Sequence, residues 1–310
     1  MTRYSVVLFA TAALILLTAF VIATAGVRLG HYDPEGDDLV RERAEQLGGP
    51  PAEIVFVGDS SVGFAVEADH ASALLGRTTA NLALSGSFGV AGSLEMIRRA
   101  EAAFGTKIFV IVHTVDILGR PTPALVAARA KPPEGRSLLE TARMGLSVMS
   151  LRDLRDIVRN VAVDARAVAA ANAAEEFYDH QSKPAPIDAL VRDLPSSRMA
   201  SVDPGAVADL LRIADHCAAR GLTCLYAHGP FWEVGCARFA AAIAQRSALI
   251  RSVENAHFRL LAETPFCMPT AIVGNNSDHV RPGDDAVTTR FYAGLVDQAL
   301  KDGSLGAPAR

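Results

Sequence analysis

The sequence has no strong excess of charge of either sign. Its 310 residues include 30 Lys and Arg against 34 Asp and Glu, which gives a formal net charge of −4. Nucleic-acid-binding proteins usually carry a marked basic excess on one face, and this charge balance does not predict one. We therefore expect no nucleic-acid partner.

Cysteine is scarce and confined to the last third of the chain. The four cysteines are Cys217, Cys224, Cys236 and Cys267. Their spacing is not that of zinc ligands, so no metal site is expected. An even number of cysteines in an exported domain permits two disulfides. We expect Cys217 to pair with Cys224 and Cys236 with Cys267, with buried free thiols as the alternative.

Two common loop signatures are also missing. The glycines at positions 86, 89 and 92 lack the close Gly-x-Gly of a dinucleotide-binding loop, and no cofactor is expected. No Gly-x-Ser-x-Gly elbow occurs, which argues against an α/β-hydrolase.

The amino-terminal region contains a long run without charge. Residues 5–26 are mostly aliphatic and are long enough to cross a bilayer as a helix. Arg3 precedes the run, which favours an orientation with the rest of the chain outside the cytoplasm. Residues 1–28 are therefore predicted to be an inner-membrane anchor, with the globular part periplasmic. Ala23-Thr24-Ala25 resembles a signal-peptidase site, so secretion after cleavage is the alternative.

Beyond the anchor, polar residues 29–51 are interpreted as a tether, 52–302 as one domain and 303–310 as a tail. In the domain, apolar runs alternate with amphipathic helical patterns, which is typical of a parallel, doubly wound α/β sheet. The five expected strands are residues 54–57, 78–84, 107–113, 222–227 and 269–273. The expected helices are residues 68–75, 91–104, 204–220, 236–261 and 287–300. Residues 117–201 break this rhythm and are interpreted as a helical insertion.

Two loops that follow predicted strands could share chemistry. Ser60 follows the first strand and His279 the fifth, and parallel strands end at the same edge of a sheet, where ligands bind. A serine hydroxyl becomes a good nucleophile when a histidine base is within hydrogen-bond reach. The backbone N–H groups of Ser60 and Gly86 could then stabilise an oxyanion. The alternatives are a helix-capping serine, a turn glycine and a surface histidine.

Three segments resemble the SGNH (GDSL-like) hydrolase superfamily. They are Gly58-Asp59-Ser60-Ser61, Asn81-Leu82-Ala83-Leu84-Ser85-Gly86, and Asp278-His279 before the last helix. The resemblance covers roughly residues 52–302 without the insertion. It implies a flavodoxin-like three-layer α/β/α fold, Ser60 as nucleophile, His279 as base and Gly86 as oxyanion donor. With the anchor, the chain is most similar to periplasmic SGNH proteins that serve O-acylation of cell-surface polysaccharides.

The chain departs from the family pattern in two places. After the third strand it has His113-Thr114-Val115-Asp116 where the family has Gly-x-Asn-Asp, so the Asn oxyanion donor is missing. The acid lies directly beside the histidine, as Asp278, and Asn276 is an alternative group to orient the imidazole. Asp59 is expected to brace its loop through backbone N–H groups. Four side chains that end the predicted strands or lie just after them are expected at the rim of the site: Asp59, His113, Asp116 and His228.

Together these features predict a serine esterase or O-acyltransferase, most simply an O-acetyl one. It would act on envelope glycan or an acylated small substrate through an acyl-serine intermediate. The alternative is a catalytically degenerate SGNH-fold module that binds glycan or a membrane acyltransferase partner. A phosphate-binding role for the Ser60 loop is a third interpretation, without support from the family resemblance.

Overall fold

The computed structural model describes residues 17–18, 21, 37–121, 130–131, 137–148, 185–192 and 194–302. The chain divides into two compact units, Met1–Asp38 with Lys131–Glu176 and Leu39–Ala130 with Phe177–Arg310. Helix α7 (Leu138–Val148) belongs to the first unit, and the central β-sheet belongs to the second.

The expected anchor and tail lie almost wholly outside the described residues, as does much of the expected insertion. Among the residues that are described, no helix is both long enough and apolar enough to span a membrane.

The second unit is an α/β domain built on a five-stranded parallel sheet. Its strands, in spatial order, are β2 (Thr79–Asn81), β1 (Ile54–Gly58), β3 (Ile108–His113), β4 (Thr223–His228) and β6 (Phe258–Leu260). All five residues of β1 are buried, and so are five of the six in β3 and in β4. Burial on both faces explains why these strands are continuous apolar runs rather than alternating ones.

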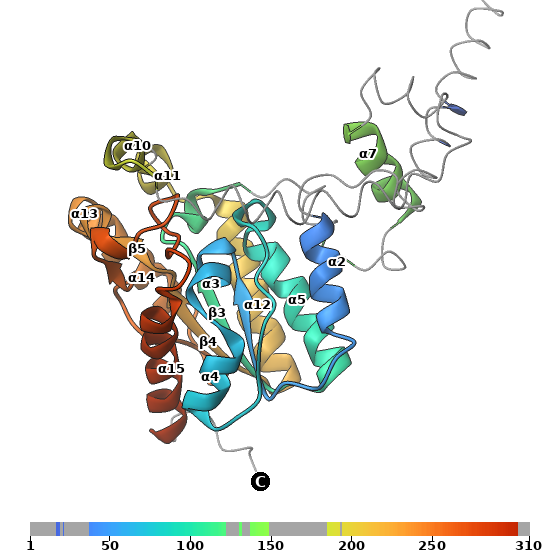
Figure 1. Ribbon diagram of the computed structural model, residues 1–310. Helices are drawn as coiled ribbons and strands as arrows, with labels where there is room; N and C mark the ends of the chain where they lie inside the picture. The colour runs from blue at the N-terminus through green and yellow to red at the C-terminus, as the bar shows by residue number, and fades with distance from the viewer. Residues whose placement is uncertain are drawn as a thin grey trace, which may run out of the picture. The chain divides into compact units, whose positions relative to one another are not determined.

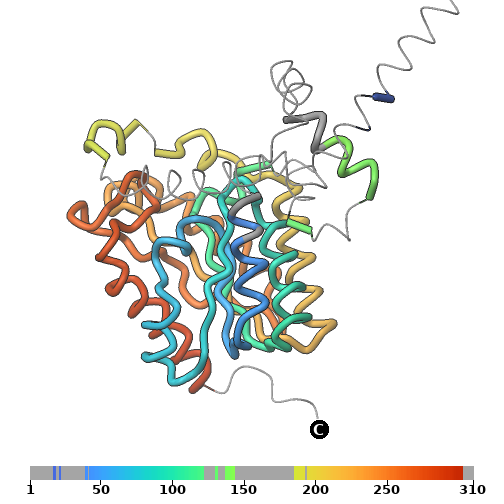
Figure 2. The backbone as a smooth tube through the Cα atoms, turned by 45° about the vertical axis from the view of Figure 1, so that its right-hand side comes forward, coloured from blue at the N-terminus to red at the C-terminus, as the bar shows by residue number. Residues whose placement is uncertain are grey.

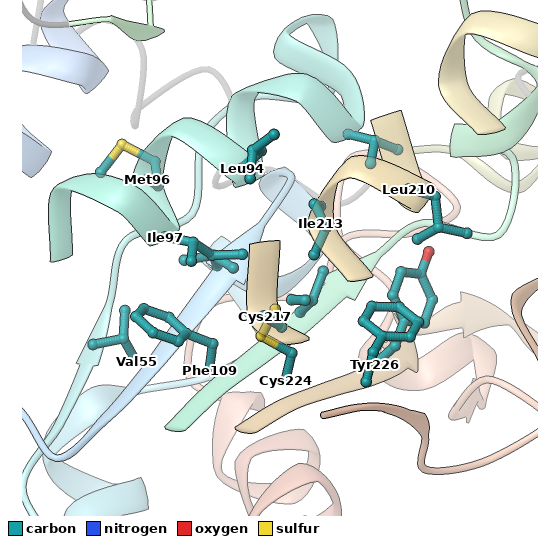
Figure 3. Close-up of a cluster of buried hydrophobic side chains, with 14 of the residues drawn as sticks. Val55, Leu94, Met96, Ile97, Phe109, Leu210, Ile213, Cys217, Cys224 and Tyr226 are labelled. Carbon is teal, nitrogen blue, oxygen red and sulfur yellow. A yellow bond between two sulfur atoms is a disulfide. The ribbon is translucent and has the colours of Figure 1, made fainter. Parts of the chain in front are cut away.

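Helices cover both faces of the sheet, which is consistent with a three-layer sandwich (Figures 1 and 2). One face packs against α2 (Asp37–Gln46), α5 (Gly89–Phe104) and α12 (Pro204–Arg220). The other packs against α3 (Ser60–Ala65), α4 (Ala68–Leu75) and α15 (Asp285–Lys301). Successive strand residues point to opposite faces, so Val55 and Phe109 join the first core and Ile54 and Val110 the second. Figure 3 shows the first core, where Phe109 lies beside Ile97 of α5.

Part of the expected tether belongs to the domain. Val40 and Arg43 of α2 are buried, and Arg43 Nε donates to the carbonyl oxygen of Ala83 at 3.0 Å. Residues 39–46 of this helix therefore pack on the sheet layer.

The prediction for the fifth strand was wrong. Residues 270–272 form a 3₁₀ turn, η4 (Thr270–Ile272), and the fifth strand is β6. The long helix predicted over residues 236–261 is two helices, α13 (Glu233–Arg238) and α14 (Ala240–Arg251), followed by β6. The second strand is also shorter than expected and ends at Asn81, although the N–H groups of Leu82 and Leu84 still donate to carbonyl oxygens of β1.

Both expected disulfides are present. Cys217–Cys224 joins α12 to β4, and Cys236–Cys267 joins α13 to β7 (Cys267–Met268). Strand β7 pairs with β5 (Phe231–Trp232) in a small parallel sheet. The prediction of two disulfides with this connectivity is confirmed, and the described residues contain no free cysteine.

Candidate active site

The serine sits at a sharp turn from strand to helix. Strand β1 ends at Gly58, whose φ of 154° suits glycine, and a Cβ there would overlap the backbone of Val112 in β3. Helix α3 then begins at Ser60, with Asp59 as its N-cap. Because Ser60 is the first helical residue, its backbone N–H has no acceptor within the helix.

Ser60 and His279 are brought together although they are 219 positions apart. Ser60 Oγ lies 2.9 Å from His279 Nε2. The other ring nitrogen, Nδ1, lies 2.9 Å from Asn275 Oδ1. An amide oxygen can only accept, so Nδ1 carries the proton and Nε2 presents its lone pair to the serine hydroxyl. His279 is 6% exposed, and its ring centroid lies 4.5 Å from that of Phe64.

The histidine is held by a tight loop rather than by the end of a strand. The backbone N–H of Gly274 donates to the carbonyl oxygen of His279 at 2.8 Å, and Val273 and Val280 form an isolated antiparallel bridge. This closure carries residue 275 across to the Nδ1 side of the ring. Trp232 N–H also donates to the carbonyl oxygen of Ser277 at 2.7 Å, which ties the loop to β5.

Neither residue expected to orient the imidazole does so. Asp278 Oδ1 lies 3.8 Å from Nε2, on the same side of the ring as Ser60, and makes no hydrogen bond with the described residues. Asn276 accepts from Ser277 Oγ at 3.4 Å, and its carbonyl accepts from the backbone of His279. Asn275 makes the contact instead, and the sequence offered only its nearness to the histidine as a signal.

Asp59 braces the loop as expected. Its Oδ1 accepts from the backbone of Ser61 at 3.0 Å, and its Oδ2 accepts from the backbone of Thr114 at 2.9 Å. The carboxyl therefore joins the end of β1 to the end of β3. It is 2% exposed, and burial raises its pKa.

His113 and His228 do not lie at the rim, contrary to the prediction. They end β3 and β4, but α5 and α14 cover them, and they are 0% and 3% exposed. His113 Nε2 lies 2.8 Å from Ser93 Oγ, and His228 Nε2 lies 2.8 Å from Ser247 Oγ. Burial lowers the pKa of each to about 4. Both are therefore neutral at pH 7 and part of the core.

Asp116 does lie beside the site, within a cluster of ion pairs. It accepts from Arg120 Nε at 3.1 Å and from Arg120 Nη2 at 2.7 Å. Arg198 Nε lies 3.1 Å from its Oδ2. Asp116 itself is fully buried. The sequence singles out neither arginine, since only the spacing of four between Asp116 and Arg120 hints at the pair.

A polar cavity of about 510 Å³ adjoins the histidine loop. Its lining comprises Thr114, Asp116, Arg120, Arg192, Leu194, Pro195, Ser197, Arg198, Asn275, Asn276, Ser277 and Asp278. Arg246, which is 1% exposed, fixes the wall at residues 198–201 by donating to the carbonyl oxygens of Arg198, Met199 and Ser201. The cavity therefore adjoins the loop that carries His279, although neither Ser60 nor His279 is among its lining residues.

Gly86 lies against the ion-pair cluster of Asp116 and Arg120. It begins the 3₁₀ turn η1 (Gly86–Phe88), just after Leu84, whose N–H donates to the carbonyl oxygen of Gly58 at 3.0 Å. A Cβ on Gly86 would lie 2.5 Å from Arg120 Nη1 and 3.9 Å from Asp59 Cβ. The glycine thus fits between the serine loop and a guanidinium.

No group of three or more His, Cys, Asp or Glu side chains suited to a metal ion occurs in the part of the chain that the structure describes. Comparisons of the chain with protein-family models, with curated proteins and with solved structures found no match. The chemistry of the site must therefore be inferred from its geometry.

Proposed function

We propose that this protein is an SGNH-type serine esterase or O-acyltransferase that acts on cell-envelope glycan through an acyl-Ser60 intermediate. The observation that carries the proposal is the relay of Ser60 Oγ, the His279 ring and Asn275 Oδ1, with both contacts at 2.9 Å. A strand order of β2-β1-β3-β4-β6 supports it, because this is the flavodoxin-like order, whose ligands bind at the carboxyl edge of the sheet.

The relay suits acyl transfer in two half-reactions. In the first, Ser60 Oγ bonds to the acyl carbon while its proton passes to His279 Nε2 and the carbonyl electrons move to the oxygen. Collapse of this intermediate breaks the bond to the leaving oxygen, which takes the proton from Nε2. In the second, water or a sugar hydroxyl attacks acyl-Ser60 along the reverse path, giving hydrolysis or transfer.

A neutral residue can serve as the third member of the relay. Asn275 holds the tautomer in which Nε2 accepts, as the Asn of Cys-His-Asn proteases does. Unlike a carboxylate, it adds no negative charge to stabilise the imidazolium. Asp278, at 3.8 Å from Nε2, supplies a negative charge on the opposite side of the ring. Asn275 would thus orient the ring, while Asp278 lies on the side of the nitrogen that takes the proton.

The proposed location is the periplasmic face of the inner membrane, with the amino-terminal run as the anchor. Two disulfides support an oxidising compartment, since they are rare in the cytosol. The polar cavity beside the site supports a hydrophilic acyl acceptor such as a glycan. An acetyl group is the simplest acyl group to propose for the serine.

Labelling with a fluorophosphonate tests the nucleophile directly. The full chain in detergent should be labelled at Ser60, as located by peptide mass spectrometry, and Ser60→Ala and His279→Gln should abolish labelling. Ser87→Ala, at an exposed serine nearby, is the matched control and should label normally. An unlabelled wild-type protein beside a labelled control esterase would refute the proposal.

The alternative is a non-catalytic module that binds glycan or a membrane acyltransferase. The neutral Asn275 and the absence of an Asn in the 113–116 segment favour it. Full envelope acylation in cells that carry only Ser60→Ala would support this alternative.

If the protein is an enzyme, hydrolysis and transfer can be told apart by incubating a glycan oligosaccharide with an acyl donor. Mass spectrometry then distinguishes transfer of the acyl group to the glycan from release of the free acid.

A further inference from the structure

We propose that Arg120 stabilises the oxyanion through its Nη1 group, together with the backbone N–H groups of Ser60 and Gly86. This inference rests on the proposed acyl-serine chemistry. It assigns to a charged side chain the position that a neutral amide donor would fill, and no Asn is present in the 113–116 segment to fill it.

The guanidinium of Arg120 is rigidly held through two of its three nitrogens, and the third is available to donate to a ligand. Two of its nitrogens, Nε and Nη2, donate to both oxygens of Asp116, which is itself fully buried. Such a fork fixes the plane of the guanidinium as well as its position. Nη1 makes no hydrogen bond with any described residue. A preorganised donor of this kind needs no rearrangement when charge develops on the substrate.

Arg120 Nη1 lies beside Gly86, where the oxyanion is expected. A Cβ on Gly86 would come within 2.5 Å of Arg120 Nη1, so any side chain at this position would push the guanidinium away. The same Cβ would lie 3.9 Å from Asp59 Cβ, which places Gly86 beside the residue that precedes the nucleophile. The N–H of Ser60, at the start of α3, is free of helical acceptors. Arg120 Nη1 and Gly86 therefore lie together beside the serine loop, where the proposed oxyanion would form.

The surrounding charges keep Arg120 protonated. Burial is the largest single effect and opposes its charge, but Asp116, Asp59 and Asp278 together outweigh it and raise the pKa of the guanidinium. Arg120 thus stays a cation across the working pH range. A hydrogen bond from a charged donor to an oxyanion is roughly twice as strong as one between neutral groups.

Arg198 provides a matched control. It also contacts Asp116, at 3.1 Å, and lines the same cavity, but it is not near Gly86 in the contacts that the structure gives. If Arg120 served only to neutralise Asp116, loss of either arginine should have a similar effect. If Arg120 acts on the oxyanion, only its loss should slow the chemistry.

Steady-state hydrolysis of p-nitrophenyl acetate by the full chain in detergent tests this. Arg120→Gln should lower kcat by about 10²- to 10³-fold with little change in KM, as loss of an oxyanion donor does. The pH–rate profile should keep its shape, because the titrating base is untouched. Arg198→Gln removes a cavity-lining partner of Asp116 but no proposed oxyanion donor, and p-nitrophenyl acetate carries no glycan to occupy the cavity, so the loss in kcat should be under about tenfold, below the range for a lost donor. Gly86→Ala, which displaces Nη1 without removing it, should reproduce the defect of Arg120→Gln.

Each outcome decides a separate question. Equal losses in Arg120→Gln and Arg198→Gln would overturn the inference, and so would an Arg120→Gln variant as active as wild type. Unchanged unfolding transitions in urea would exclude misfolding, and if Arg120→Gln unfolds, Arg120→Lys and Gly86→Ala decide in its place. An inactive wild-type enzyme would refute the proposed function and this inference with it. Activity lost in Ser60→Ala but retained in Arg120→Gln and Gly86→Ala would refute this inference alone.

Discussion

Two neutral histidines buried at the carboxyl end of the sheet should make the stability of the fold depend on pH. His113 and His228 have an ordinary pKa of 6.5 when unfolded and about 4 in the native protein. Burial is the main cause for both. The positive charge of Arg120 further lowers the pKa of His113, and that of Arg246 further lowers the pKa of His228. Protonation of either ring in the core therefore opposes folding.

The size of the effect follows from the difference between the pKa of each histidine in the unfolded state and its pKa in the native state. A pKa depressed in the folded state gives stability that is fully present above pH 6.5 and is lost as the pH falls towards 4. At about 1.4 kcal/mol per pH unit, the gap amounts to about 3 kcal/mol for each histidine. Asp59 acts in the opposite direction, because burial raises its pKa and the native state takes up its proton first. The net loss on acidification should therefore be smaller than the two histidines alone would give.

Urea unfolding between pH 7.5 and 4.5 measures this dependence. Trp232 is the only tryptophan and is 2% exposed, so its fluorescence reports global unfolding of the domain. His228→Gln should flatten the decline by up to about 1.4 kcal/mol per pH unit, since its amide can keep a bond to Ser247 without titrating. His70→Gln, which removes a histidine outside the core, is the matched control. Parallel profiles for wild type and His228→Gln would refute the reasoning.

Two further predictions concern the relay and the disulfides. Asn275→Ala should lower kcat by about 10²-fold, because the imidazole is no longer held in the reactive tautomer. Asn275→Asp should retain activity, because a carboxylate accepts the same proton, and a loss equal to that of Asn275→Ala would contradict this role. Replacing Cys236 and Cys267 by serine opens a loop with a sequence separation of 31 and should cost about 3.5 kcal/mol in urea unfolding. The Cys217 and Cys224 pair, with a separation of 7, should cost only about 2 kcal/mol, and equal losses would argue against loop entropy as the cause.

The sequence predicts the central strands well because they are buried on both faces and must be apolar throughout. It fails at the sheet edge. Strand β6 has only three residues and one neighbour, and half-buried Arg259 in its middle interrupts the apolar pattern. Residues 269–273 are more apolar but form a turn after Pro269. An edge strand is defined by its pairing, which a single sequence does not encode locally.

The residues of the candidate site likewise divide into those that the sequence predicts and those that it does not. Ser60 and His279 could be singled out because each lies in a polar loop after an apolar run. The partner of the imidazole could not, because the bond from Gly274 N–H to the carbonyl oxygen of His279 decides which side chain reaches Nδ1. His113 was expected at the rim from its place at a strand end, but α5 covers it. Arg120 could not be singled out, because its place beside Gly86, 34 positions earlier in the chain, arises only in the folded structure.

The separation of 219 positions between Ser60 and His279 has a consequence for biogenesis. A chain that emerges from its amino terminus exposes Ser60 long before His279 has been made. Strands β1 to β4 can assemble first, and the loop that contacts the serine arrives with the last tenth or so of the polypeptide. Under the proposed mechanism a partly synthesised chain therefore has no base for its serine, and the pair forms only once the loop of His279 has been made.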